Sequence, residues 1–302
     1  MLRKRRLAVL GGIVAVLAVV ASFRALTAEA RPEKPYLKDS PMILAHQGAS
    51  GHAPSNTMPS FQLAMTQGAD VLELDVHMTR DGVIVVSHDE TIDRMSSGSG
   101  YIKSMTLQEL RQYDFGFDFT PDGGKTFPYR GKGVTIPTLE DVFKAYPNTR
   151  INIEIKQLDP AMEEPLWALV QRYDMYDKVL INSFYSEAYD RWTGVAGDRV
   201  AVGANRGHMY EYMAYYLPRA TWMYHPKVDA FQLPLEQKLG PFTIRFDTRR
   251  FIDTAHRLGI KVHYWTINDE ATMRHLLSIG ADGIITDFPD RAAKVQREAG
   301  FR

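Results

Sequence analysis

Short apolar segments recur along the chain and are separated by longer, helix-like segments. Eight of the short segments have the length and composition of strands: Met42–Ala45, Val71–Val76, Ile151–Ile155, Val179–Ile181, Val200–Val202, Ala230–Leu233, Val262–Trp265 and Gly283–Thr286. Strands that alternate with helices indicate a parallel sheet, and eight is the number of strands that closes a barrel. We therefore predict an α/β fold, a (β/α)₈ TIM barrel. An open doubly wound sheet is the structural alternative.

Helix-terminating residues predict where two of the helices begin and end. Asn56-Thr57 is expected to cap a helix over Met58–Gln67, which should stop at Gly68. Asn268 is expected to start the helix Glu270–Ile279, closed by a second glycine.

One interval does not follow the alternation of strands and helices. Arg80-Asp81-Gly82 has the composition of a hairpin turn, so Val83–Ser87 should fold back beside the second strand. About sixty residues then precede the next strand, which is long for a loop in a compact domain. We predict a small insertion over about 90–148, above the mouth of the barrel.

The amino-terminal segment has the pattern of a secretory signal. Arg3-Lys4-Arg5-Arg6 precedes the uncharged apolar run Leu7–Phe23, and Ala28-Glu29-Ala30 offers a cleavage site with small residues. The run is also near the lower length limit of a membrane span. We expect residues 1–30 to be a cleaved signal peptide or a signal anchor, with membrane attachment through residues 7–23 in the second case. Residues 31–302 would then be extracytoplasmic: periplasmic, secreted or anchored facing outward.

Charge and cysteine content exclude several classes of function. The 302 residues include 36 basic and 36 acidic side chains, so the chain lacks the basic excess typical of nucleic-acid binding proteins. There is no cysteine, which excludes disulfides and thiolate metal sites.

Two of the predicted strands carry acidic residues inside apolar runs. Side chains two apart in a strand share a face, so Glu73 and Asp75 should point together, as should Glu154 and Lys156. Burying an unpaired carboxylate is costly, and oxygen ligands favour a hard cation. We predict that Glu73, Asp75 and Glu154 bind one divalent cation, Ca²⁺ or Mg²⁺. The alternative is that these acids form structural ion pairs, with Lys156 as the partner of Glu154.

Two histidines also fall at the carboxyl ends of strand-like segments, where TIM barrels have their active sites. His46 follows the first strand and His88 follows the hairpin segment. A histidine pair beside a metal can transfer protons near neutral pH, and Lys156 adds charge for an anionic substrate. This combination is suited to cleaving a phosphate ester. Either histidine taken alone could equally be a structural residue.

Several motifs, in order along the chain, resemble the glycerophosphodiester phosphodiesterase family. They run from about Pro41 to Ala293: Ala45–Thr57, Glu73-Leu74-Asp75-Val76, Ser87-His88-Asp89, Ile136–Glu140, Asn152–Lys156, Asn182-Ser183-Phe184, Trp265–Asn268 and Asp282–Pro289. The resemblance implies a TIM barrel with one divalent metal and a pair of catalytic histidines. Carried onto this sequence, it implies that the acid–base pair is His46 and His88 and that the metal ligands are Glu73, Asp75 and Glu154. It further implies that Lys156 contacts the phosphate and that Trp265 lines the pocket, although Trp265 could also be a packed barrel residue.

The chain departs from the family pattern at two positions. Gln47 stands where the family usually has an arginine, and Ser55 stands where it usually has a glutamate. Gln47 is expected to bind substrate through a hydrogen bond, without the charge-assisted bidentate contact of an arginine.

The resemblance implies hydrolysis of glycerophosphodiesters to glycerol 3-phosphate and an alcohol, by attack of water or of a neighbouring substrate hydroxyl. A lysophospholipase D acting on lipid substrates is one alternative. The aromatic residues that could favour an acyl chain are Phe115, Phe117, Phe119, Trp222 and Tyr224. A non-catalytic exported binding protein that has kept the barrel is the other alternative.

Overall fold

The structure is a computed structural model that describes residues 14, 16–20, 29–239 and 242–302. The predicted targeting segment 1–30, with its apolar run 7–23, therefore lies largely outside the described residues. Within the described ranges, no helix is long and apolar enough to cross a membrane.

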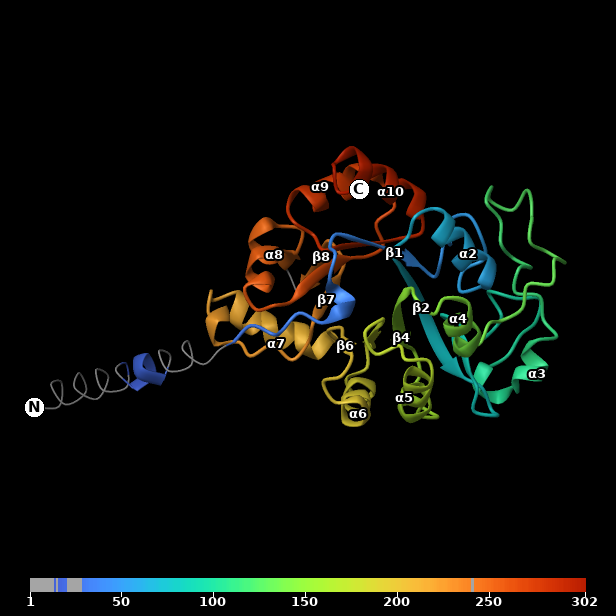
Figure 1. Cartoon of the computed structure of the whole chain (residues 1–302), viewed down its shortest axis with the longest axis horizontal. Helices are drawn as coiled ribbons and strands as arrows, with labels where there is room; N and C mark the ends of the chain where they lie inside the picture. Colours follow the sequence, from blue (N-terminus) through green and yellow to red (C-terminus); the bar gives the residue numbers. More distant parts are fainter. Residues whose placement is uncertain (1–13, 15, 21–28, 240–241) are drawn as a thin grey trace, which may run out of the picture.

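Eight parallel strands form the predicted barrel (Figure 1). They are β1 (Met42–His46), β2 (Val71–Met78), β4 (Arg150–Ile155), β5 (Val179–Asn182), β6 (Ala201–Val202), β7 (Ala230–Leu233), β10 (Lys261–Tyr264) and β11 (Gly283–Thr286). Their order in the sheet is β6-β5-β4-β2-β1-β11-β10-β7. A single parallel bridge between Gly203 and Ala230 joins the two ends of this series, so the barrel is nearly closed. The predicted fold and each of the eight strands are confirmed.

The strands are buried on both faces, as expected of a parallel sheet covered by helices. Along β1, Ile43 and Ala45 pack outward into the core beneath the helices, whereas Met42 and Leu44 belong to a smaller interior cluster. The 3-10 helix η1 (Pro35–Leu37) adds two buried side chains to that interior cluster. The segment just before β1 thus closes the amino-terminal end of the barrel.

Helices follow most strands and cover the outside of the barrel. They are α2 (Met58–Thr66), α4 (Leu139–Ala145), α5 (Glu163–Arg172), α6 (Ser186–Ala196), α7 (Arg206–Tyr216), α8 (Arg249–His256), α9 (Glu270–Ser278) and α10 (Pro289–Glu298). Thr57 is the N-cap residue of α2, as predicted. The predicted start of α9 is wrong by one residue, because Asp269 and not Asn268 accepts a hydrogen bond from the backbone N–H of Thr272, at 2.8 Å.

The hairpin after β2 is confirmed, and the long interval that follows contains two structural parts. Strand β3 (Ile84–Val86) pairs antiparallel with β2. The 3-10 helix η2 (Ile102–Ser104) and the short helix α3 (Leu107–Leu110) lie over a separate small apolar cluster. Figure 1 shows this part beyond the end of β2. By contrast α4 packs into the main core, so it is a helix of the barrel although it falls within the interval 90–148.

A second hairpin was not predicted from the sequence. Strands β8 (Glu236–Leu239) and β9 (Phe242–Arg245) pair antiparallel after β7, outside the barrel sheet. The 3-10 helix η3 (Thr221–Met223) lies between α7 and β7.

Candidate metal-binding active site

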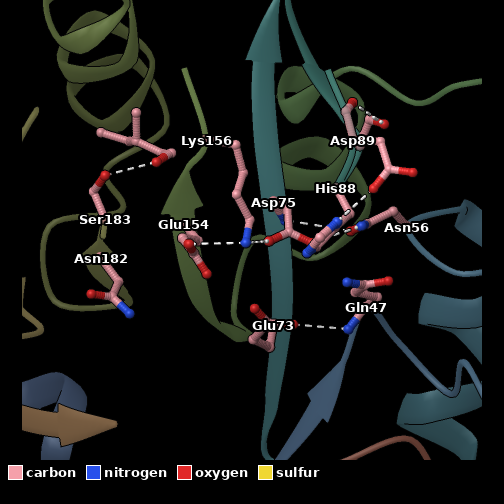
Figure 2. A network of polar contacts seen from close by, with 12 residues as sticks. Gln47, Asn56, Glu73, Asp75, His88, Asp89, Glu154, Lys156, Asn182 and Ser183 are labelled. Carbon is pink, nitrogen blue, oxygen red and sulfur yellow. Dashed lines mark hydrogen bonds and ion pairs between the residues drawn. The ribbon is translucent and has the colours of Figure 1, made fainter. Parts of the chain in front are cut away.

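Three buried carboxylates from adjacent strands converge inside the barrel. Glu73 and Asp75 lie two apart on β2, and Asp75 is the register partner of Glu154 on β4. One carboxylate oxygen from each of the three lies within 4.8 Å of the others. Figure 2 shows the three side chains pointing into one space between β2 and β4. The convergence predicted from the two-residue spacing is therefore present.

Each carboxylate also has a contact that orients it. The backbone N–H of Gln47 donates to Glu73 Oε2 at 2.9 Å, and the side-chain amide of Asn56 donates to Asp75 Oδ2 at 3.0 Å. Lys156 Nζ lies 2.9 Å from Glu154 Oε1 and 3.2 Å from Asp75 Oδ1 (Figure 2). These contacts hold the carboxylates in place before any ligand is bound.

The acidic cluster has more negative charge than the neighbouring cation neutralises. Burial is the main cause that raises the pKa of Glu73, and the charge of Asp75 raises it further, whereas His46 and the backbone of Gln47 act in the opposite direction. Burial likewise raises the pKa of Glu154, although Lys156 opposes the shift. A divalent cation would supply the missing positive charge, and a set of only carboxylate oxygens suits Ca²⁺ or Mg²⁺. The residues present therefore fit such an ion.

The loop after β1 positions His46 against a carboxylate at the end of β11. His46 Nδ1 lies 2.7 Å from Asp287 Oδ1, and a carboxylate can only accept, so Nδ1 is the donor. This contact leaves Nε2 of His46 as the nitrogen available to a ligand. Burial lowers the pKa of His46, but the hydrogen bond to Asp287 and the charge of Glu73 outweigh it and raise the pKa to about 9.

Asp287 is itself held by polar side chains from two loops. Its carboxylate accepts from Ser50 Oγ at 2.8 Å and from the Asn268 amide at 2.6 Å. Burial raises the pKa of Asp287, yet the contacts with His46, Asn268 and Ser50 bring it below its usual value. Asn268 is occupied by this network, which explains why the next residue caps α9.

His88 has a similar partner, the aspartate that follows it in the sequence. Its Nδ1 lies 2.7 Å from Asp89 Oδ1. Arg94 binds the same carboxylate with two hydrogen bonds, of 2.7 and 3.1 Å. The hydrogen bond from Arg94 is the main reason that the pKa of Asp89 falls to about 2. Each histidine thus has one nitrogen fixed by an aspartate.

A cavity of about 260 Å³ brings the predicted residues together at the carboxyl ends of the strands. The residues that line it are His46, Glu73, Asp75, His88, Glu154, Lys156, Asn182, Phe184, Gln232, Trp265, Thr266 and Ile285. Lys156 and Trp265 are therefore in the pocket, as predicted. Gln47 is not in this lining; its observed contribution is the backbone hydrogen bond to Glu73. Within the described lining, Lys156 is the single lysine or arginine.

Comparison with protein families agrees with this geometry. The family model described as the glycerophosphoryl diester phosphodiesterase family matches residues 46–291, which include every residue of the site named above. The chain belongs to this family. It is a phosphodiesterase of the phosphoric diester hydrolase class.

Individual relatives cover most of the chain. A glycerophosphodiester phosphodiesterase of Caldanaerobacter subterraneus subsp. tengcongensis is 32% identical over 264 residues, which are 86% of this chain and 99% of that protein. A lysophospholipase D of Homo sapiens is 28% identical over 269 residues, 82% of this chain and 83% of that protein. The solved structure of an Oleispira antarctica phosphodiesterase, in complex with the product sn-glycerol-3-phosphate, is 27% identical with a TM-score of 0.66. It covers 85% of this chain and 97% of its own.

Within this phosphodiesterase fold, several functional residues were missed by sequence reasoning. Asp89, Asn182 and Asp287 were part of recognised motifs but received no role, and Gln232 lines the cavity although it belongs to none of those motifs. Asp89 directly follows a histidine at a strand end, which is a local signal that could have been used. Asp287 and His46 are 241 residues apart, so the sequence gives no sign of their contact.

Neither of the two departures from the family pattern, Gln47 and Ser55, belongs to the lining of the active-site cavity. Gln47 is buried with a backbone φ of 55°, and Gly48 beside it has a φ of 83°. A Cβ on Gly48 would lie 2.4 Å from Ser60 Oγ, so this tight turn requires glycine. Ser55 Oγ points to Met95 Sδ at 3.8 Å, away from the acidic cluster.

The aromatic residues proposed for an acyl chain are not in a common pocket. Phe115 and Tyr224 are buried in apolar clusters, and Trp222 is exposed. None of the five lines the active-site cavity. These five residues therefore do not support the lipid-substrate alternative, since aromatic composition alone does not distinguish core residues from pocket residues.

Proposed function

We propose that this phosphodiesterase hydrolyses glycerophosphodiesters to glycerol 3-phosphate and an alcohol, with one bound divalent cation, Ca²⁺ or Mg²⁺. One observation carries the proposal: the three converging carboxylates lie in the same cavity as two histidines, each oriented by an aspartate. The name of the Caldanaerobacter relative and the product bound in the Oleispira structure support the choice of substrate.

Glu73, Asp75 and Glu154 would hold the cation, which when bound would neutralise the phosphate oxygens. Lys156, already within 3.2 Å of two of these carboxylates, would add its charge on the side of Glu154. Trp265 would form part of the wall that positions the substrate, since it lines the cavity. Gln47 would act mainly through its backbone, by fixing Glu73.

The two histidines would divide the proton transfers between them. Because Nδ1 of each is engaged by an aspartate, Nε2 is the atom that would exchange a proton with the substrate. One imidazole would give a proton to the leaving oxygen of the alcohol. The other would take a proton from the attacking group, which is water or a neighbouring hydroxyl of the substrate.

The test is release of glycerol 3-phosphate from glycerophosphocholine by the purified protein, with Ca²⁺, with Mg²⁺ and with a chelator. We expect turnover with at least one ion and its loss on chelation. Glu154→Gln should lower kcat/KM by at least about 10²-fold, because it removes one charged ligand. Glu164→Gln, an exposed change on α5, is the matched control and should behave as the wild type.

Two results would overturn the proposal. Turnover that is indifferent to chelation and to Glu154→Gln would remove the metal from the reaction. Calorimetric binding of glycerophosphocholine, with no phosphodiester consumed under any ion, would instead support the non-catalytic binding protein.

A further inference from the structure

A second pocket, of about 310 Å³, lies beside the active-site cavity. It is formed where β6 and β7 end and α7 begins, and its walls include Ala204, Met209 and Tyr210 on one side. Leu233 and Phe246 form the other side. It plays no part in the contacts that hold the carboxylates or the histidines.

The pocket adjoins the active-site cavity, because the two share three lining residues, Phe184, Gln232 and Trp265. The rings of Phe184 and Trp265 meet edge to face, with their centroids 6.2 Å apart. Lys156 Nζ lies 5.7 Å from the centroid of Phe184. In Figure 2, Asn182 and Ser183, which precede Phe184, lie on the side of Glu154 away from His88. A substituent on a phosphate held near Lys156 would therefore reach the second pocket by passing Phe184.

The walls of this second pocket select an apolar substituent. Besides the shared residues, the lining is dominated by aliphatic and aromatic side chains, including Pro234. Aromatic walls can also attract a quaternary ammonium, but such sites depend on negative potential. No carboxylate belongs to the described lining, and Arg206 places a positive charge there, with its guanidinium carbon 5.7 Å from the centroid of Phe184. A choline group is therefore disfavoured in this pocket, and a hydrocarbon chain is favoured.

The outer rim of the second pocket carries two exposed aromatic rings beside the exposed Arg206 and Gln237. Tyr210 is 64% exposed and Phe184 is 42% exposed, which is high for large aromatic side chains. A hydrocarbon chain longer than the pocket could extend outward between these two rings and remain in apolar contact with them.

We propose that the second pocket binds an alkyl chain carried by the phosphodiester substrate, so that single-chain amphiphiles are preferred over the smallest glycerophosphodiesters. The inference rests on the proposed function, because the alkyl chain is positioned by the phosphate group that carries it, bound at the acidic cluster. The chain can belong to the glycerol, as in a lysophospholipid, or to the leaving alcohol, and both would present the same hydrocarbon to these walls.

Two substrate series distinguish these sources. One series esterifies glycerol 3-phosphate with methanol, butanol, hexanol or octanol. The other attaches ether-linked methyl, butyl, hexyl or octyl chains to the glycerol of glycerophosphocholine. In the series whose chain enters the pocket, we expect kcat/KM to rise about threefold for each methylene until the pocket is full. A flat dependence in both series would overturn the proposal.

Substitutions in the second pocket test whether this pocket causes the preference for longer alkyl chains. Ala204→Phe should fill it, and Tyr210→Asp should place a carboxylate at its rim; each should lower the octyl-to-methyl ratio of kcat/KM by about tenfold. Tyr210→Asp changes an exposed residue and so guards against a folding defect in Ala204→Phe. Leu217→Asp is the control: it adds the same charge just after α7, at a residue that is 56% exposed and outside the pocket lining. The proposal is wrong if the two pocket variants keep the wild-type ratio.

Calorimetry separates failure of this inference from failure of the proposed function. If no phosphodiester is turned over, the proposed function fails, but octyl phosphonate should still bind more tightly than methyl phosphonate. Equal affinity for the two phosphonates would overturn the second-pocket proposal, whether or not the enzyme is active.

Discussion

Asp287 determines which nitrogen of His46 faces the active-site cavity. Its carboxylate receives Nδ1 and is fixed in turn by Ser50 and Asn268, so the imidazole has one tautomer and one orientation. Asp89 does the same for His88, with Arg94 as its support. At the scale of single residues, the site is therefore two histidine–aspartate pairs placed around an acidic cluster.

This arrangement predicts the effect of neutralising Asp287. Asp287→Asn should lower kcat by about 10²- to 10⁴-fold with little change in KM, because the amide no longer stabilises the charged imidazole or selects its tautomer. Steady-state kinetics with glycerophosphocholine would measure both constants.

The matched control is Asp290→Asn, three residues further along the chain. The side chain of Asp290 is 47% exposed, and its Oδ1 lies 3.3 Å from His52 Nε2. Asp290→Asn should keep the wild-type kcat. If Asp287→Asn keeps it as well, Asp287 has no role in orienting His46.

Residue identities were predictable where the pattern is local. Glu73 and Asp75 share a face because side chains alternate along any strand, whatever the strand pairs with. The partner of His46 was not predictable, because the pair joins β1 to the residue after β11. Gln47 was assigned to the substrate from its position in a motif, yet its side chain is outside the cavity lining.

At the scale of elements, the positions of the strands were predictable from the sequence. The hydrophobic core against which a helix packs was not. The interval 90–148 contains a small separate core and also α4, whose residues Leu139, Val142 and Phe143 pack into the barrel core. The apolar spacing of α4 indicates a helix with one buried face, but it does not indicate which of two cores that face contacts.

Asp282 shows how one buried carboxylate connects several elements at the amino-terminal end of the barrel. It accepts from His256 Nε2 at 2.6 Å and from the backbone N–H of Val262 at 2.9 Å, and it lies 3.3 Å from Lys261 Nζ. These contacts link α8 and β10 to the start of β11. Burial raises the pKa of Asp282, but the contacts with His256, Val262 and Lys261 outweigh it and lower the pKa.

The lowered pKa of Asp282 predicts a pH-dependent contribution to stability. A carboxyl with a lower pKa in the folded state stabilises the fold above its unfolded pKa, and this stability is lost as the pH falls through the folded value. Asp282→Asn should therefore lower the free energy of unfolding by about 2–4 kcal/mol at pH 7. The difference from wild type should shrink below about pH 4, the unfolded pKa of an aspartate.

Urea unfolding at several pH values would measure this difference. Asp253→Asn, at an exposed position on α8, is the control and should change stability by less than about 0.5 kcal/mol. A constant difference between Asp282→Asn and wild type from pH 7 to pH 3 would contradict the assignment.

At the scale of the whole molecule, the active site and Arg31 lie at opposite ends of the barrel. The site occupies the carboxyl ends of β1, β2 and β4, whereas Arg31 is fixed at the amino-terminal end. Its backbone N–H donates to Leu258 O at 3.1 Å, and its Nε donates to Asp229 Oδ1 at 2.6 Å, just before β7.

We propose that residues 1–30 direct export and that the barrel functions outside the cytoplasm. The sequence pattern of the segment supports this proposal. Mass spectrometry of the protein from fractionated cells would test it. A chain that begins at Arg31 is expected after cleavage, and a full-length chain in the membrane fraction is expected for an anchor. A full-length chain in the cytoplasmic fraction would contradict export.

The sequence by itself determined the eight strands, the shared faces of the acidic residues and the position of the histidines at strand ends. These features depend on alternation and composition within a few residues, so they do not require knowledge of the remaining fold. The tertiary structure decided which aspartate orients His46, which core receives α4, and that the second pocket lies beside the first. His46 and Asp287 meet because β1 pairs with β11, which lies at the other end of the sequence. The second pocket lies where the bridge between Gly203 and Ala230 brings β6 beside β7. Such contacts are set by the geometry of the closed ring and leave no periodic signal along the chain.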